Sequence, residues 1–217
     1  MKKVILLFLT LLPLTSHALF YAGGYGQIGF SDLSDSPEAY NSTRDLNHGG
    51  WTLHAGIGGR LGISYMLVKA GVVGDYSKQQ WEGEREDANV QNGFDGAEDY
   101  DNVFERTMYG AFVMVDLPAM PIYLIGEYYA KVKGQATYAQ PVGENPFSQG
   151  DEYEGKGFGL GAGGSFAFLN TNAILRRIVL DKYSLSGVNY NLPGSQYKKK
   201  QGAWEFTLQF GIAVDLL

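Results

Sequence analysis

The C-terminal segment, residues 204–216, alternates strictly between apolar side chains and polar or small ones. Seven consecutive alternate positions are apolar: Trp204, Phe206, Leu208, Phe210, Ile212, Val214 and Leu216. An α-helix would scatter these side chains around its surface, whereas a β-strand places them all on one face. The segment is therefore predicted to be a strand with one apolar face and one polar face.

The same alternation recurs through the rest of the chain and predicts eight strands in all, with ten as the alternative. The other seven are predicted at residues 20–30, 51–62, 66–77, 104–115, 122–137, 156–168 and 174–188. In residues 104–115, the face of Met108 and the face of Tyr109 are equally good candidates for the apolar side. In residues 174–188, Arg176 shares a face with Ile178, a conflict that a β-bulge would resolve.

The connections between these segments alternate between short and long. Short connections are expected near residues 63–65, 116–121 and 169–172, and long ones at 31–48, 79–103, 138–154 and 189–201. Antiparallel neighbours joined in this way form an up-and-down meander with brief turns at one end and long loops at the other. An even number of strands also returns the C-terminus to the end where the first strand starts.

The N-terminus has the three-part pattern of a secretory signal peptide. Lys2 and Lys3 precede an apolar run at residues 4–14, and Ser16 and Ala18 are small residues at the −3 and −1 positions of a cleavage site. The run is too short for a spanning helix, which needs about 20 apolar residues; a retained anchor is the alternative. The expected organisation is a cleaved signal peptide, residues 1–18, followed by one barrel domain, residues 19–217, with four long outer loops.

Alternation alone fits both a soluble barrel, with apolar residues inside, and a membrane barrel, with apolar residues outside. Aromatic residues at both ends of the predicted apolar faces favour the membrane form. Those near the long loops are Trp51, Tyr76, Phe158 and Trp204, and those near the short turns are Phe20, Tyr65, Phe166 and Phe168. Without a long apolar helix, only a closed barrel satisfies every backbone polar group within lipid.

The mature chain resembles the small eight-stranded outer-membrane barrels of Gram-negative bacteria, such as the OmpA membrane domain, OmpX, OmpW and the opacity proteins. The most specific part of the resemblance is a C-terminal assembly signal formed by Gln209, Gly211, Val214 and Leu216. The family usually ends on an aromatic residue, whereas this chain ends on Leu217. The resemblance implies an all-β, up-and-down antiparallel transmembrane barrel. It also implies Sec-dependent export, insertion by the barrel-assembly machinery, and contact with outer-membrane lipids and lipopolysaccharide.

The polar faces of the predicted strands carry balanced charges. The inward set is Arg60, Lys69, Asp75, Glu127, Lys131, Lys133, Arg177, Asp181, Glu205 and Asp215. An eight-stranded barrel holds little more than its own side chains, and buried charges must pair. The interior is therefore predicted to be a plug of ion pairs, with a gated, narrow polar path as the alternative. Inward glycines such as Gly58 and Gly159 either make room for Tyr25, Tyr129 and Arg60 or line a cavity for a small apolar or amphipathic molecule.

Composition and charge argue against several classes of function. The net charge of −6 argues against a nucleic-acid partner, and the absence of Cys excludes disulfides, thiolate metal sites and a cysteine nucleophile. The loop at residues 79–103 holds eight acidic residues against Arg85 alone. Its run at residues 95–101 lacks EF-hand spacing, so neither a metal site nor a cofactor is predicted.

The expected role is non-enzymatic: a structural or surface-interaction protein whose acidic outer loops meet an unknown extracellular ligand. One alternative is a porin-like, narrow channel for a small amphipathic solute, of the OmpW type. The other is a lipid A-modifying enzyme. Beyond the signal peptide the chain has only His48 and His54, and neither is followed two residues later by the Ser that is expected from the pattern of lipid A deacylases.

Overall fold

The computed structural model describes residues 19–35, 51–85, 98–118, 120–139, 148–166, 168–191 and 201–216. The predicted signal peptide, His48 and most of the long acidic loops lie outside the described residues. In the part of the chain that the structure describes, no helix has the length and apolar character needed to cross a membrane.

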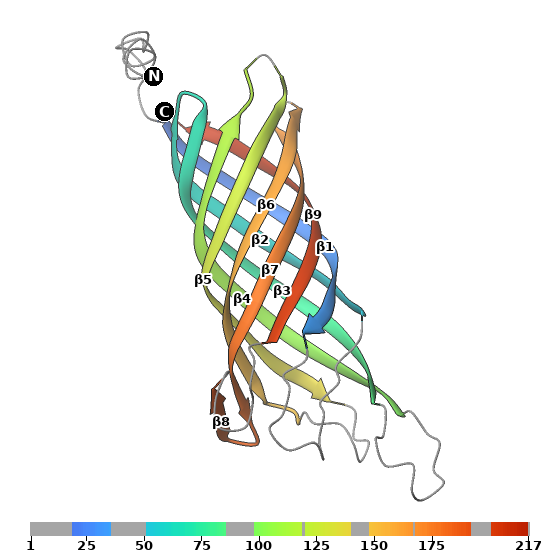
Figure 1. Ribbon diagram of the computed structural model, residues 1–217. Coiled ribbons are helices and arrows are strands. Elements are labelled where there is room, and N and C mark those ends of the chain that lie inside the picture. Colours follow the sequence, from blue (N-terminus) through green and yellow to red (C-terminus); the bar gives the residue numbers. More distant parts are fainter. Residues whose placement is uncertain are drawn as a thin grey trace, which may run out of the picture.

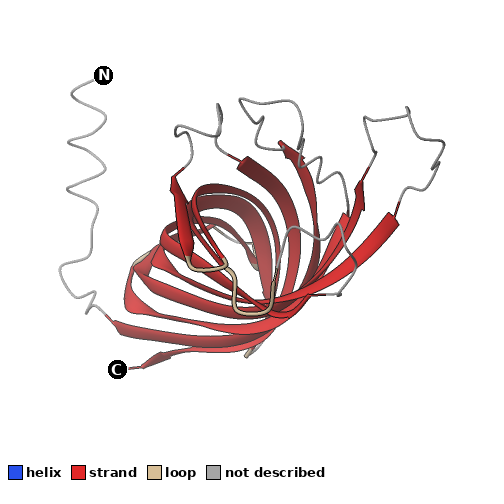
Figure 2. Cartoon of the chain, turned by 90° about the horizontal axis from the view of Figure 1, so that it is seen from below, coloured by secondary structure: helices blue, strands red, loops and turns tan. Residues whose placement is uncertain are grey.

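The described residues contain nine strands, eight of which close into an antiparallel barrel (Figure 1). The strands are β1 (Leu19–Asp35), β2 (Trp51–Tyr65), β3 (Val68–Arg85), β4 (Glu98–Asp116), β5 (Ile122–Ala139), β6 (Glu152–Phe166), β7 (Leu169–Leu185), β8 (Val188–Asn191) and β9 (Gln201–Leu216). Neighbours along the chain from β1 to β7 pair with each other, and β9 pairs with both β7 and β1. Viewed from one end, the strands form a closed ring (Figure 2). The predicted fold is confirmed, with eight barrel strands.

The short strand β8 lies outside the barrel wall. It pairs only with the end of β7, where Leu185 faces Val188 across a two-residue turn. Ser186 and Gly187 in this turn both have positive φ, 49° and 80°, which matches the type I′ turn that joins twisted antiparallel strands. The β7–β8 hairpin therefore extends one side of the barrel at the end opposite the short turns (Figure 1).

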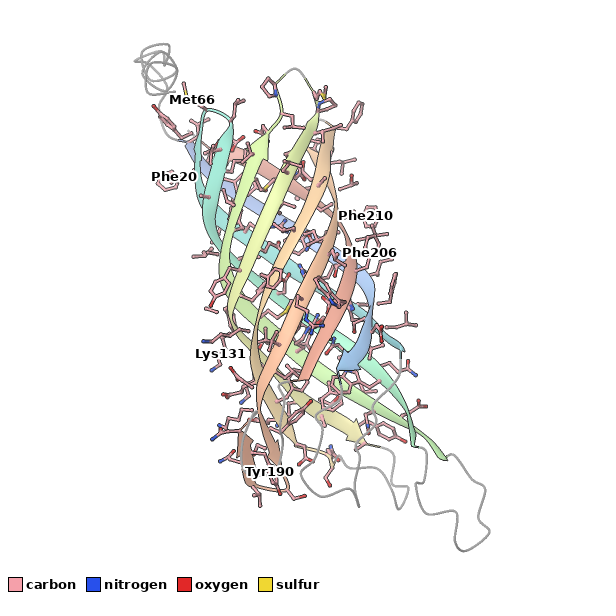
Figure 3. The ribbon with its side chains drawn as sticks, viewed as in Figure 1. Phe20, Met66, Lys131, Tyr190, Phe206 and Phe210 are labelled. Atoms are coloured by element: carbon pink, nitrogen blue, oxygen red, sulfur yellow. The ribbon has the colours of Figure 1, made fainter. Side chains whose placement is uncertain are left out.

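The barrel is apolar outside and largely polar at its centre. Leu53, Ile57 and Leu61 of β2 point outward with 62–67% exposure, as predicted, while Arg60 between them is buried. On β4 the structure selects one of the two candidate faces, because Tyr109 and Val113 are exposed whereas Met108 is fully buried. Figure 3 shows Phe206 and Phe210 of β9 projecting away from the barrel.

A β-bulge in β5 reverses the inward face of this strand. Tyr109 of β4 pairs with Lys131 and Gly110 pairs with Tyr129, so Ala130 is an extra residue. Ala130 and Lys131 therefore both point outward, and Val132 lies in the core beyond them. The prediction that Lys131 and Lys133 face inward is wrong, because one inserted residue shifts the period-2 alternation. Figure 3 shows Lys131 on the outer surface.

The second corrected strand is β7, whose apolar residues Ile174 and Ile178 face the interior instead of the outside. Arg176 shares that face and is fully buried, whereas Arg177 lies on the outer side with its guanidinium 5.3 Å from the Trp204 ring. The prediction that Arg177 faces inward is therefore wrong. Asp181, also predicted inward, is the extra residue of a bulge between Leu180 and Lys182 and is only half-buried.

Candidate functional site: a charge cluster inside the barrel

Six charged side chains, each from a different strand, meet at the centre of the barrel. Arg60, Asp75, Arg106, Glu127, Arg176 and Glu205 come from β2, β3, β4, β5, β7 and β9, and each is at most 4% exposed. We refer to these six residues as the interior charge cluster. Three guanidinium groups face three carboxylates, so the cluster is formally neutral. This balance is what a low-dielectric interior requires of buried charges.

Arg176 is the hub of the interior charge cluster because it reaches all three carboxylates. Its Nη2 lies 3.1 Å from Glu127 Oε2 and 3.4 Å from Asp75 Oδ2, and its Nη1 lies 3.4 Å from Glu205 Oε1. Arg106 holds Glu205 with a bidentate pair of hydrogen bonds, at 2.6 and 3.1 Å. Arg60 donates to Glu127. The cluster thus links strands from all around the ring.

Two tyrosines also form hydrogen bonds with the carboxylates of the interior charge cluster, and they pack against inward-facing glycines. Tyr25 donates a hydrogen bond to Asp75 Oδ1 at 2.6 Å, and the hydroxyl of Tyr129 bonds with Asp75 and Glu127. A Cβ atom at Gly58 would lie 2.2 Å from Asp75 Oδ1 and 2.5 Å from the Tyr25 ring. The absence of a side chain at Gly58 therefore makes room for Tyr25, one of the two accounts that the sequence left open.

Other interior side chains contact one another on both sides of the interior charge cluster. Toward the long loops, the ring centroids of Trp81, Phe104 and Tyr153 lie 4.5–5.8 Å apart. Toward the short turns, Lys69 Nζ lies 3.0 Å from Asp116 and 3.8 Å from Asp215, which places Lys69 at the inner edge of the barrel as predicted. A cavity between this end and the interior charge cluster measures about 10 Å³, room for about one water molecule.

The residues of the predicted assembly signal have distinct places in β9. Gln209 is buried and accepts hydrogen bonds from Arg60 Nη2 at 2.7 Å and from Asn172 Nδ2 at 3.1 Å. Gly211 packs against Tyr25, where a Cβ atom would lie 2.7 Å from the Tyr25 Cβ. Val214 and Leu216 are exposed on the outer face. Gln209 and Gly211 thus serve the interior packing, and their role as a signal stays a prediction.

His54 is buried and faces the interior beside the interior charge cluster. Its Nε2 lies 3.6 Å from Glu205 Oε1 and 3.3 Å from Thr207 Oγ1. Ser77, on the neighbouring strand β3, accepts a hydrogen bond from Arg106 Nε at 3.2 Å. His54 is therefore an auxiliary polar contact at the edge of the interior charge cluster.

Sequence reasoning missed two of the three cluster arginines, Arg106 and Arg176. Arg106 lay on a strand whose register was ambiguous, and Arg176 was placed on the outer face with Ile178. Two features of the sequence could have placed both arginines inside the barrel. Each carboxylate predicted inside needs a cation, and an arginine on an otherwise apolar strand face is costly in lipid but tolerated in a paired interior.

The outer surface carries the aromatic residues that were predicted to lie at the two ends of the apolar belt. Toward the long loops, Tyr76, Phe158 and Trp204 are exposed, and toward the short turns Phe20, Tyr65, Phe166 and Phe168 are exposed. The side chain of Trp51 lies outside the described residues. The molecule is thus a closed eight-stranded barrel with an apolar outside and a charged, hydrogen-bonded centre, the inverse of a soluble barrel.

No protein-family model matches the chain, and no curated protein sequence matches it. Among solved structures, the chain is similar to Ail, the attachment invasion locus protein of Yersinia pestis. The two are 14% identical, with a TM-score of 0.38, over 92% of this chain and 100% of the Ail chain.

Proposed function

We propose that this protein is an outer-membrane barrel that neither conducts nor catalyses and that holds its acidic loops at the cell surface. The observation that carries the proposal is the interior charge cluster, whose six paired side chains occupy the centre of the barrel. A barrel of this kind is a rigid support. Its activity then lies in the loops, which present a surface to an extracellular ligand.

The exposed apolar surface supports the placement in a membrane. Its outward-facing stretch on β3 runs from Val68 to Tyr76, and that on β6 runs from Phe158 to Phe166. Each stretch covers nine residues, close to the 9–11 residues with which a tilted strand crosses a bilayer. Charged side chains begin directly beyond it, with Lys78 on β3 and Lys156 on β6. Together with the predicted signal peptide, these features favour the bacterial outer membrane.

The interior contacts favour a plug over a path. Opening a bore through the interior charge cluster would separate buried ion pairs, and leaving one partner of such a pair uncompensated costs about 3–5 kcal/mol. The cavity on the short-turn side of the cluster, about 10 Å³, is also too small for an amphipathic solute. His54, the candidate base for lipid A modification, is buried against Glu205 within the barrel, away from the outer lipid surface.

Single-channel conductance in a planar bilayer tests the plug. We expect the refolded wild-type protein to be silent, and the double variant Arg106→Ala/Arg176→Ala to show openings because two of the three central guanidinium groups are gone. Lys131→Ala is the matched control and should stay silent, since Lys131 lies on the outer surface. The opposite outcome would be steady openings of the wild-type protein that change in Arg176→Ala but not in Lys131→Ala. That result would contradict the plug and favour the channel.

The role of the loops is tested on whole cells. Residues 86–97 of the most acidic loop are replaced by a two-residue Asn-Gly turn, which suits an antiparallel hairpin. We expect the shortened protein to fold normally, because the interior charge cluster is untouched, but to lose the adhesion that this proposal predicts for cells carrying the wild-type protein. Equal phenotypes for the two proteins would contradict a role for this loop.

A further inference from the structure

Toward the long loops, five strands continue beyond the apolar belt of the outer surface. We refer to this part as the outer section, which comprises residues 78–85 of β3, 98–105 of β4, 132–139 of β5, 152–156 of β6 and 178–185 of β7. Strand pairing persists through it, since Arg85 of β3 still faces Glu98 of β4. The outer section extends past the ends of β1 and β9 (Figure 1).

The outer section reverses the polarity of the belt. On β6, Tyr153 is buried between Glu152 and Glu154, and on β4, Phe104 is buried beside Glu105. Because side chains alternate along a strand, the aromatic rings point inward and the glutamates point outward. Within the belt, the apolar side chains of both strands point outward instead. The outer section is therefore apolar inside and polar outside, as in a soluble β-protein.

Inward aromatic side chains of the outer section pack against one another. The ring centroids of Trp81, Phe104 and Tyr153 lie 4.5–5.8 Å apart, and the Tyr183 ring lies 6.5 Å from that of Tyr153. We refer to these four rings, each at most 6% exposed, as the aromatic core. Gly134 of β5 leaves room for the Tyr153 ring, because a Cβ atom at this position would clash with it.

Ion pairs lie on the outer face of the same strands. The three pairs are Lys78–Glu105 at 3.3 Å, Lys133–Glu152 at 2.8 Å and Lys182–Glu154 at 4.0 Å. Their side chains are 32–62% exposed, and they connect β3 to β4, β5 to β6 and β6 to β7. Exposed charges are unfavourable against hydrocarbon but common at a surface in water. The outer face of the outer section is therefore suited to water.

A buried carboxylate connects the far end of the outer section. Asp151 is 4% exposed, and its two oxygens accept hydrogen bonds from the backbone N–H groups of Ser148, at 2.8 Å, and Ser186, at 2.7 Å. Ser186 lies in the β7–β8 turn. The backbone oxygen of Asp151 also accepts a hydrogen bond from the N–H group of Ala136 in β5, at 2.8 Å. Contacts outside the belt thus hold this end together.

We propose that the outer section stands in water outside the membrane and folds around the aromatic core. This inference rests on the membrane placement in the proposed function. Residues 78–85 of β3 extend about 20 Å along the barrel axis, given a rise of about 3.4 Å per residue and a strand tilt of about 40°. The loops on these strands therefore begin well clear of the hydrocarbon. The outer face of the outer section then belongs to the surface that an extracellular ligand can contact.

Spin labels at single cysteines test where the outer section stands. The chain has no Cys, so Gln135→Cys and Leu124→Cys each carry one label. Both positions point outward on β5, the first in the outer section and the second in the belt. In phospholipid vesicles, oxygen collides mainly with labels in hydrocarbon, and a water-soluble nickel chelate collides mainly with labels in water. We expect the nickel chelate to dominate at Gln135→Cys and oxygen to dominate at Leu124→Cys.

The two labels distinguish failure of this inference from failure of the proposed function. Oxygen dominating at both positions would overturn the inference alone, because the outer section would then lie in hydrocarbon. The nickel chelate dominating at both positions would overturn the membrane placement, and this inference with it.

Limited trypsin digestion of the refolded protein in neutral maltoside micelles tests the aromatic core. In Phe104→Ala we expect cleavage after Lys133 and Lys182, which the wild-type protein resists, because the outer section opens locally when its core is lost. The matched control is Phe112→Ala, which removes a buried ring on the short-turn side of the same strand and should leave both lysines protected. A heat-dependent shift in gel mobility confirms that each variant is folded.

Two digestion results would overturn the role of the aromatic core. The first is protection of Lys133 and Lys182 in folded Phe104→Ala, and the second is their cleavage in the wild-type protein. Leu180→Ala, a smaller truncation among the buried side chains of the outer section, serves as the test variant if Phe104→Ala does not refold. Bilayer conductance and cell adhesion hold or fail independently of both experiments.

Discussion

At the scale of single residues, two consecutive arginines of β7 have opposite environments. Arg176 contacts three buried carboxylates, whereas Arg177 lies on the outside against Trp204. We expect Arg176→Ala to lower the free energy of unfolding by about 3–5 kcal/mol, because it leaves buried carboxylates without their shared cation. Arg177→Ala should cost less, about 1–2 kcal/mol, because it loses a cation–π contact on the outer side of the barrel and leaves no buried carboxylate of the cluster uncompensated. Urea unfolding of both variants in neutral maltoside micelles measures this difference. Equal losses of unfolding free energy would contradict the role of Arg176 in the interior charge cluster.

At the scale of one element, the bulge in β5 decides which residues face inward. Deleting Ala130 should leave Tyr129 and Val132 inside and yield a folded barrel, because only the extra residue is lost. Deleting Gly126 from the same strand should prevent folding, since residues 127–129 then change faces and Glu127 moves toward lipid. The heat-dependent gel mobility shift after refolding reports both outcomes. Normal folding without Gly126 would show that β5 tolerates either register.

At the scale of the whole molecule, the exposed apolar belt predicts how much an introduced charge should destabilise the barrel at each depth in the membrane. Val72 lies at the middle of the outward stretch of β3 and is 61% exposed. We expect Val72→Arg to cost about 2–4 kcal/mol in a bilayer, as for basic residues at the midplane of membrane barrels. Gln80→Arg, farther along the same face of β3, should cost about 0–1 kcal/mol. Unfolding from phospholipid vesicles provides the comparison, and equal costs would place β3 in water instead of lipid.

The sequence by itself determined the eight barrel strands and the inversion of apolar and polar faces, but not the short strand β8 or the long-loop ends of β3 and β4. Regular alternation, as on β2 and β9, specifies a strand and its outward face because side chains point to opposite sides with a period of two. The inward positions of Arg60, Asp75, Glu127 and Glu205 followed from that rule.

Only the tertiary structure decided whether side chains near the bulges point into or out of the barrel. It also decided which charged side chains pair with one another inside. A single extra residue, Ala130 or Asp181, changes the face of the residues beyond it, and nothing in the local pattern marks where it is inserted. Lys131 thus lies outside, and Arg176 takes the interior place that the sequence had suggested for Arg177. The physical reason is that strand pairing around a closed barrel sets the register of each strand. In addition, buried carboxylates are stable only when arginine or lysine side chains pair with them.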